Sequence, residues 1–325
     1  MKKNVTLVAA LIATLSCFCG AEAEDFPSHP ITMVVPNPPG GPTDTLGRIV
    51  ADGMKNSLGQ PVVIENITGA GGTIAGAHTA RATPDGYTIE IGNWSSHVGA
   101  AAIYAVDYDV LKDLQPLSLL AYAPLWIVGK KDLPPKNAAE LITWLKGNSA
   151  PSTFATVGAG SAAHVCGIFF QQKTGAQFQY VPYRGAGPII QDLLAGHIDL
   201  SCLDASATLP SVQSGGFKAY AIMSEERWPR APQIPTMSES GIPGLTISFW
   251  EGLWAPRGLP KPVMDKLVAS VNTSLADPAV RERLEKIGQV IFPANQLGPE
   301  KLAAYHKAET EKWWPIIKAA GIKGE

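Results

Sequence analysis

Hydrophobic and polar positions follow a repeated order along this chain: a short apolar run, a turn rich in glycine or proline, and then a stretch with helical periodicity. The apolar run at 31–35 predicts a buried strand, which prolines and glycines end abruptly. Apolar residues at 46, 49, 50 and 54 then predict an amphipathic helix. Similar units follow at 61–80, 88–97, 152–173 and 178–194. Repeated strand–turn–helix units predict an α/β fold with a mainly parallel sheet.

The middle and the end of the chain extend this pattern. Apolar runs at 117–120 and 125–128 predict two short strands with Tyr122-Ala-Pro124 between them. A further strand is predicted at 245–253, and polar–apolar patterning predicts helices at 261–275, 278–287 and 299–320.

The length of the chain predicts more than one lobe, because roughly 300 residues exceed one ordinary domain. The strand-like segments near 122–127 and 247–253 are the natural crossovers between two lobes. We therefore predict a discontinuous first lobe (24–124 and 251–325) and a second lobe (125–250). Two crossings of this kind also make a plausible hinge.

Residues 1–23 have the pattern of a secretory signal peptide, with Lys2 and Lys3 before an apolar core and Ala21-Glu22-Ala23 as a cleavage site. Removing them takes away two lysines and one glutamate, which changes the formal net charge from −2 to −3. That balance argues against a role on nucleic acid or on a membrane surface.

Two of the four cysteines, Cys166 and Cys202, remain in the mature chain. An oxidising compartment would permit them to form a disulfide. Two small buried thiols, one on a helix and one on a strand, are the interpretation that we favour at this point.

The turn at 36–44 is the first candidate for chemistry. Gly40 and Gly41 lack a Cβ atom, so a ligand can approach the backbone, and Thr43 and Asp44 fall where a helix needs a cap. The free N–H groups of the first helical turn suit an anion, since the helix dipole acts with them. The alternative is a stiff strand-to-helix connector.

A second glycine turn at 158–163 allows four interpretations. It matches the dinucleotide pattern G-x-G-x-x-A, but no acidic residue follows at the end of the next strand. Ser161 and His164 suggest a serine hydrolase, although the G-x-S-x-G pattern is absent. Otherwise Ser161 caps a helix with His164 in the interior, or the Ser161 hydroxyl and nearby N–H groups hold a carboxylate.

The remaining polar residues predict no metal site and no cofactor. The six histidines are scattered, without paired-ligand spacing, and no P-loop sequence occurs. Asp204 ends the apolar run at 198–203, where it would bind a cation or hydroxyl of a ligand, or cap a turn.

Several stretches together resemble one family. They are Pro-Ile-Thr-Met-Val-Val-Pro (30–36), Pro-Pro-Gly-Gly-Pro-Thr-Asp (38–44), Gly-Ala-Gly-Gly-Thr-Ile (69–74), Pro-Asp-Gly-Tyr-Thr (84–88), Gly-x-Gly-Ser-x-x-His (158–164), Val-Pro-Tyr-Arg-Gly (181–185), Phe-Trp-Glu-Gly-Leu (249–253) and Lys-Ala-Ala-Gly-Ile-Lys (318–323). The combination resembles the Bug, or tripartite tricarboxylate transporter receptor, family of periplasmic solute-binding proteins.

The resemblance implies a two-lobed, type II-like Venus-flytrap fold, each lobe a mainly parallel sheet flanked by helices, that closes on a small carboxylate in the periplasm. It also implies an inner-membrane permease as the partner. The residues implied for the carboxylate end of the ligand are Asn37, Gly40, Thr43, Asp44, Gly160, Ser161, Ala162 and His164. Those implied for its variable end are Asp204 and the loop around Asn93–Ser96, in particular Trp94 and Ser95.

Two positions depart from the family pattern. Trp94 stands where a small polar residue is common, and 99–102 replaces a usual Asn-Pro. Trp94 would either stack on an aromatic acid or cover its own loop.

Our hypothesis from the sequence is therefore a monomeric receptor, not an enzyme, for a dicarboxylate, tricarboxylate, amino acid or aromatic acid. The rivals are a secreted hydrolase that uses Ser161 and His164, and a ligand-sensing subunit for a signalling partner.

Overall fold

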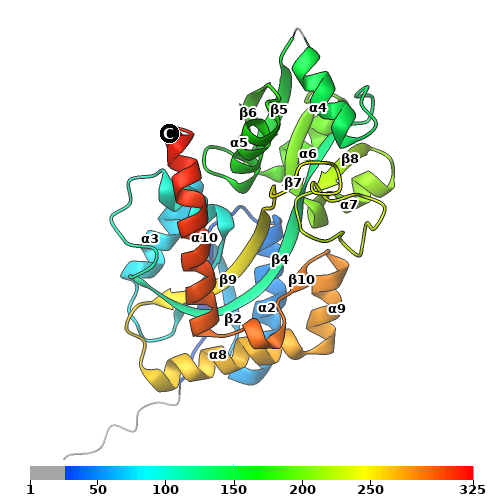
Figure 1. Ribbon diagram of the computed structural model, residues 1–325. Helices are drawn as coiled ribbons and strands as arrows, with labels where there is room; N and C mark the ends of the chain where they lie inside the picture. The colour runs from blue at the N-terminus through cyan, green and yellow to red at the C-terminus, as the bar shows by residue number, and fades with distance from the viewer. Residues whose placement is uncertain (1–25, 149, 325) are drawn as a thin grey trace, which may run out of the picture.

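The computed structural model describes residues 26–148 and 150–324 (Figure 1). The predicted signal peptide lies outside the described residues. Within the described part of the chain, no helix combines the length and the apolar character needed to cross a membrane.

Strands and helices alternate through most of the chain, as the sequence predicts. The strands are β1 (Ile31–Val35), β2 (Val62–Asn66), β3 (Thr88–Asn93), β4 (Leu114–Lys130), β5 (Ser152–Thr156), β6 (Phe178–Pro182), β7 (Leu200–Asp204), β8 (Phe217–Ile222), β9 (Ser248–Pro256) and β10 (Val290–Ile291). The helices are α2 (Pro42–Leu58), α3 (Thr73–Arg81), α4 (Ala138–Gly147), α5 (Ala162–Thr174), α6 (Ala186–Ala195), α7 (Ala205–Gln213), α8 (Lys261–Ala276), α9 (Pro278–Lys286) and α10 (Pro299–Ala319). Short helical turns are η1 (Ala70–Gly72), η2 (Ser95–Gly99), η3 (Ala100–Ala102) and η4 (Ala294–Gln296).

The sheet has two halves that share β4, in the order β2-β1-β3-β9-β4-β7-β5-β6 (Figure 1). In the first half β1 pairs in parallel with β2 and β3, and in the second half β5 pairs in parallel with β6 and β7. The long strands β4 and β9 run antiparallel to their neighbours. The fold is therefore the expected two-lobed α/β architecture, with a mixed rather than parallel centre.

The prediction of two separate strands around 117–128 is wrong, because β4 is continuous through Pro124. Pro124 is the last β4 residue that pairs with β9, opposite Ser248, and pairing with β7 begins at Leu125. Its missing N–H therefore falls where β4 changes partner, a place that tolerates proline.

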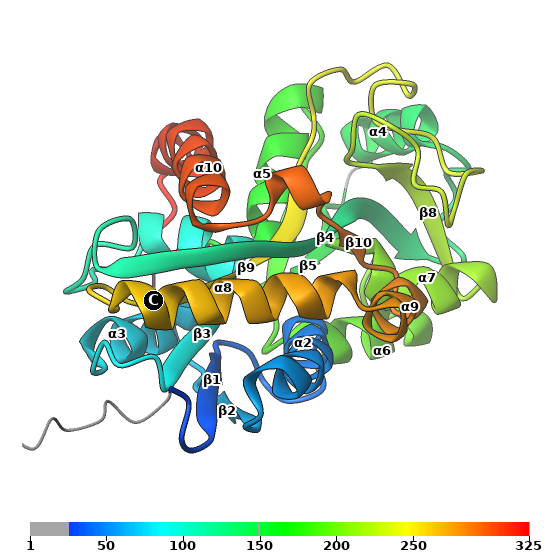
Figure 2. The same cartoon turned by 90° about the horizontal axis from the view of Figure 1, so that it is seen from below.

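Strand β9 presents different residues to the helices on its two faces. Trp250 and Trp254 pack against His306 of α10, whereas Leu253 and Ala255 belong to the core that includes residues of α8. This alternation follows from the two-residue period of a strand. Figure 2 shows α10 and α8 on opposite sides of β4 and β9. The predicted helices at the end of the chain thus cover both faces of the first half.

Cys166 of α5 and Cys202 of β7 form a disulfide, so the free-thiol interpretation is wrong. Both residues are fully buried. They lie 36 positions apart in the chain, and only the packing of α5 on β7 brings them together. The disulfide fixes the helix that follows the second glycine turn to the strand that ends at Asp204.

Candidate ligand-binding site

The first turn differs in one detail from the sequence prediction. Gly41 is the N-cap of α2, so Thr43 and Asp44 lie inside the first helical turn and do not cap it. The Asp44 carboxylate accepts hydrogen bonds from the Gly40 N–H (2.8 Å), Arg48 Nε (2.9 Å) and Asn66 Nδ2 (2.9 Å). Burial opposes its ionisation, but these hydrogen bonds outweigh burial and hold the pKa of Asp44 below its usual value. Asp44 therefore fixes the shape of the turn.

Asn93, at the end of β3, ties the first turn to the sheet. Its Nδ2 donates to Asn37 Oδ1 at 2.7 Å and lies 3.2 Å from Thr43 Oγ1. Asn93 and Thr43 are buried. Asn37 and Thr43 are predicted site residues, and Asn93 begins the loop at 93–96 that the resemblance implies for the variable end of the ligand.

The second turn, at the start of α5, is closed by Ser161. Ser161 is the N-cap: its Oγ accepts from the His164 N–H (3.2 Å) and donates to the Gly158 carbonyl (2.8 Å). The His164 ring accepts from the Gly160 N–H through Nδ1 and packs edge-on against Tyr180, and burial lowers the pKa of His164. Ser161 thus contacts the backbone of His164 and not its ring, which is not the geometry of a nucleophile and its base.

The short helical turn η2, which follows β3 in the first half of the sheet, contacts the second turn, which belongs to the second half. Ser95 Oγ, in η2, accepts a hydrogen bond of 3.0 Å from the N–H of Ala162 at the start of α5. Gly99 lies against Gly160, where a methyl group on Gly99 would lie 1.9 Å from the Gly160 carbonyl oxygen. Gly160 itself has a φ of +71°, which favours glycine. The structure therefore shows η2 closed on the second turn.

Asp204 is the N-cap of α7, as one of the two interpretations expected. Its Oδ1 accepts from the Ser206 N–H (2.7 Å) and hydroxyl (2.5 Å). Its Oδ2 is buried and has no hydrogen-bond partner among the described residues. Burial raises the pKa of Asp204, and the hydrogen bonds from Ser206 oppose this rise.

Trp94 is fully buried and covers its own loop. Its Nε1 donates to Glu309 Oε2 at 3.0 Å, and its ring packs edge-on against Trp313, 5.6 Å away between centroids. Both partners belong to α10. In this structure Trp94 therefore anchors the loop that carries Ser95.

Glu251 is a residue that the sequence prediction missed. It is fully buried on β9, directly opposite Asn93 of β3, and neither of its carboxyl oxygens has a hydrogen-bond partner of normal geometry among the described residues. The signal that could have identified it is a charged residue inside an otherwise apolar strand, Phe249 to Ala255.

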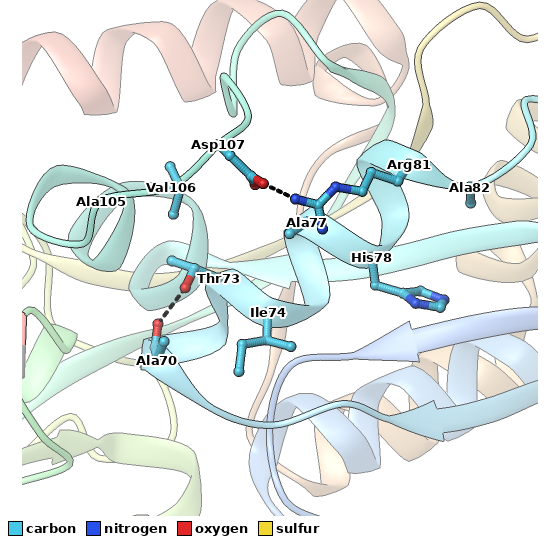
Figure 3. Close-up of a pocket in the computed structure, with 10 residues that line it drawn as sticks. All are labelled: Ala70, Thr73, Ile74, Ala77, His78, Arg81, Ala82, Ala105, Val106 and Asp107. Atoms are coloured by element: carbon cyan, nitrogen blue, oxygen red, sulfur yellow. Dashed lines mark hydrogen bonds and ion pairs between the residues drawn. The ribbon is translucent and has the colours of Figure 1, made fainter.

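Two surface hollows lie outside the contact between the turns. The hollow in Figure 3, of about 770 Å³, is lined by α3 and by residues 105–107, and the ion pair between Arg81 and Asp107 crosses it. None of its lining residues belongs to the predicted site. A second hollow, of about 650 Å³, lies between the first turn and α9 and is lined by Gly40, Asp44 and Arg283 among others.

A known protein family matches most of this chain. Residues 46–322 match the family described as the tripartite tricarboxylate transporter family receptor. The chain belongs to this family.

Solved structures of receptors in this group have the same fold. The periplasmic binding protein BugD is 39% identical, with a TM-score of 0.85 over 92% of this chain and 100% of its own. MatC from Rhodopseudomonas palustris, solved with bound malate, is 35% identical, with a TM-score of 0.84 over 90% of this chain and 100% of its own. Another R. palustris protein, solved with adipate, is 30% identical, with a TM-score of 0.83 over 92% of this chain and 99% of its own. These likenesses confirm the fold and the receptor family expected from the sequence.

Proposed function

We propose that this chain is a periplasmic receptor that captures a small organic carboxylate between two lobes and delivers it to the permease of a tripartite tricarboxylate transporter. The lobe boundaries that we propose are those of the sequence analysis, at 124/125 in β4 and at 250/251 in β9. The chain is exported by its signal peptide and performs no chemistry on its ligand.

The observation that carries this proposal is the hydrogen bond from the Ala162 N–H to Ser95 Oγ. An oxygen from the first half already lies at the N-terminus of a helix in the second half, where unpaired N–H groups and the helix dipole favour an anion. A ligand carboxylate would take this position between the lobes. The malate and adipate bound by two relatives support a carboxylate as the ligand.

The residues that we assign to the carboxylate are those of the two turns. Asn37, Gly40, Thr43 and Asp44 shape the first turn, and Gly160, Ser161, Ala162 and His164 shape the second. Ser95 and Asp204 lie towards the variable end, and Trp94 positions Ser95. A hydrolase that uses Ser161 is not favoured, because its hydroxyl is held by backbone groups.

A ligand is expected to raise the melting temperature. At a free concentration 100 times the Kd, binding stabilises the folded state by about 2.7 kcal/mol, which raises the Tm by several degrees. The measurement is a thermal shift with mono-, di- and tricarboxylates, amino acids and aromatic acids. A panel in which no acid raises the Tm would contradict the proposal.

Replacing Gly99 with alanine is expected to weaken ligand binding at least about tenfold without unfolding the protein. The added methyl would lie 1.9 Å from the Gly160 carbonyl oxygen, so η2 and the second turn could not close as they do here. Gly187→Ala is the matched control, since a Cβ there meets nothing within 4 Å. Equal affinities of both variants, measured by calorimetry, would show that this closed contact is not required for binding.

A further inference from the structure

The C-terminal helix α10 makes a contact between the two halves of the sheet that lies outside the contact of η2 with the second turn. Its Trp313 packs against the ring of Phe169 in α5, with 5.4 Å between centroids and an interplanar angle of 85°. Trp313 is fully buried and Phe169 is 8% exposed. Figure 1 and Figure 2 both show α10 beside α5. Since α5 belongs to the second half and α10 packs on β9 and η2 of the first, the two rings join the halves.

Trp313 is fixed to the first half through the loop that carries Ser95. Trp94, the residue before Ser95, packs edge-on against the Trp313 ring with 5.6 Å between centroids. Two backbone carbonyls of η2 accept hydrogen bonds of 3.0 Å from other side chains of α10, His306 and Trp314. The loop and α10 therefore form one unit, and Trp313 keeps its place relative to Ser95.

Phe169 is fixed to the second half by its helix. It lies about one turn after Cys166, whose disulfide joins α5 to β7. It also lies seven residues, about two turns or roughly 10 Å, after Ala162, whose N–H donates to Ser95 Oγ. Residues seven apart lie on the same side of a helix. A rigid α5 therefore brings Phe169 to Trp313 when it brings Ala162 to Ser95.

The pair of rings borders solvent. Lys312 Nζ lies 4.8 Å from the centroid of the Trp313 ring, and Lys173 Nζ lies 5.5 Å from that of Phe169. Both lysines are exposed. Moving α5 away from α10 would bring water to the apolar faces of the two rings, which is unfavourable. The pair thus favours the arrangement in which the halves are together.

We propose that Trp313 and Phe169 form a latch that stabilises the closed receptor and so sets its affinity, although neither residue contacts the ligand. This inference rests on the proposed function, in which the halves close on a carboxylate. A contact that exists only in the closed form raises the population of that form, and the apparent affinity rises by the same factor. For one aromatic pair that factor is about three to ten.

Phe169→Leu is expected to weaken ligand binding about three- to tenfold, because it removes the aromatic contact and keeps an apolar side chain. The loss should appear in the dissociation rate, since the ligand enters the open form before the latch exists, and the association rate should change less than about twofold. The probes are malate, adipate, citrate, L-glutamate and benzoate. Calorimetry measures the affinity, and stopped-flow fluorescence measures the two rates.

Phe170→Leu is the matched control, because it makes the same change at the next residue of α5. Phe170 is buried and packs against Phe178 inside the second half. Its replacement should lower the stability but leave the affinity within about twofold of the wild type. If wild type binds an acid and Phe169→Leu binds it equally well, or if both variants lose the same affinity, the latch is refuted and the proposed function stands. If no acid binds wild type, the proposed function fails and the latch with it.

Tryptophan fluorescence provides a second readout, which a contact that is the same in the open and closed forms would not change. Packing of Trp313 against Phe169 on closure removes its ring from water, so an acid that binds should shift the emission of wild type to shorter wavelength. Trp313→Phe should reduce this shift, whereas Trp144→Phe, on α4 of the second half, should keep it. An undiminished shift in Trp313→Phe would overturn the inference.

Discussion

Breaking the Cys166–Cys202 disulfide is expected to lower the free energy of unfolding by about 3–4 kcal/mol. The cross-link closes a loop of 36 residues, and the loss of chain entropy in the unfolded state for a loop of this size has that magnitude. Both sulfurs are buried between α5 and β7, so reduction also loosens the second turn relative to Asp204. We therefore expect ligand affinity to fall together with stability.

The measurement is urea unfolding of the wild-type protein with and without a reducing agent. The two forms have the same sequence and differ only in whether the disulfide is formed. The Cys166→Ala/Cys202→Ala variant separates the cross-link from the reductant, and reductant should not change its midpoint. Identical midpoints for oxidised and reduced wild type would contradict the expectation.

Replacing Glu90 with glutamine is expected to make stability less dependent on pH between about 4.5 and 8. Burial raises the pKa of Glu90 to about 8, with the Thr79 hydroxyl opposing the rise, from a value of 4.5 in the unfolded chain. Between these values the folded state binds one proton more than the unfolded state, so stability falls as pH rises, by about 1.4 kcal/mol per pH unit. Over the whole interval the loss is roughly 5 kcal/mol.

The comparison is sharpest between pH 6.5 and 8. Burial lowers the pKa of His97 well below its usual value and that of His306 to about 4, so both are neutral in the folded state in this window. In the unfolded chain they titrate alike in wild type and variant, so their contribution cancels in the difference between the two. Urea unfolding should show a difference between wild type and Glu90→Gln that changes by about 2 kcal/mol over the window. Glu65→Gln, on the exposed side of β2, should follow the wild type. Parallel curves for wild type and Glu90→Gln would refute the assignment of this pH dependence to Glu90.

The glycine turns could be predicted from the sequence because their determinants are local. A strand that ends in prolines and glycines before a helical pattern specifies the turn at 36–44 and the start of α2. The same reasoning located Ser161 as a possible cap of α5, which the structure confirms. It failed at Thr43 and Asp44, because Pro42 begins the helix one residue earlier and makes Gly41 the cap.

The continuity of β4 could not be predicted, because it depends on which strands lie beside it. Pro124 ends a strand when only local propensity is considered. In the structure Pro124 is the last residue of β4 that pairs with β9, and pairing with β7 begins at the next residue. The missing N–H of Pro124 therefore lies where β4 changes partner, and the strand continues through it.

The sequence by itself determined the α/β units, the two glycine turns and the receptor family, because short-range patterns and family motifs carry that information. Only the tertiary structure decided which distant residues meet. It joined Cys166 to Cys202, buried Trp94 under α10, and placed Glu251 beside Asn93. These contacts are set by strand register and by the packing of elements far apart in the chain, and no local pattern encodes either.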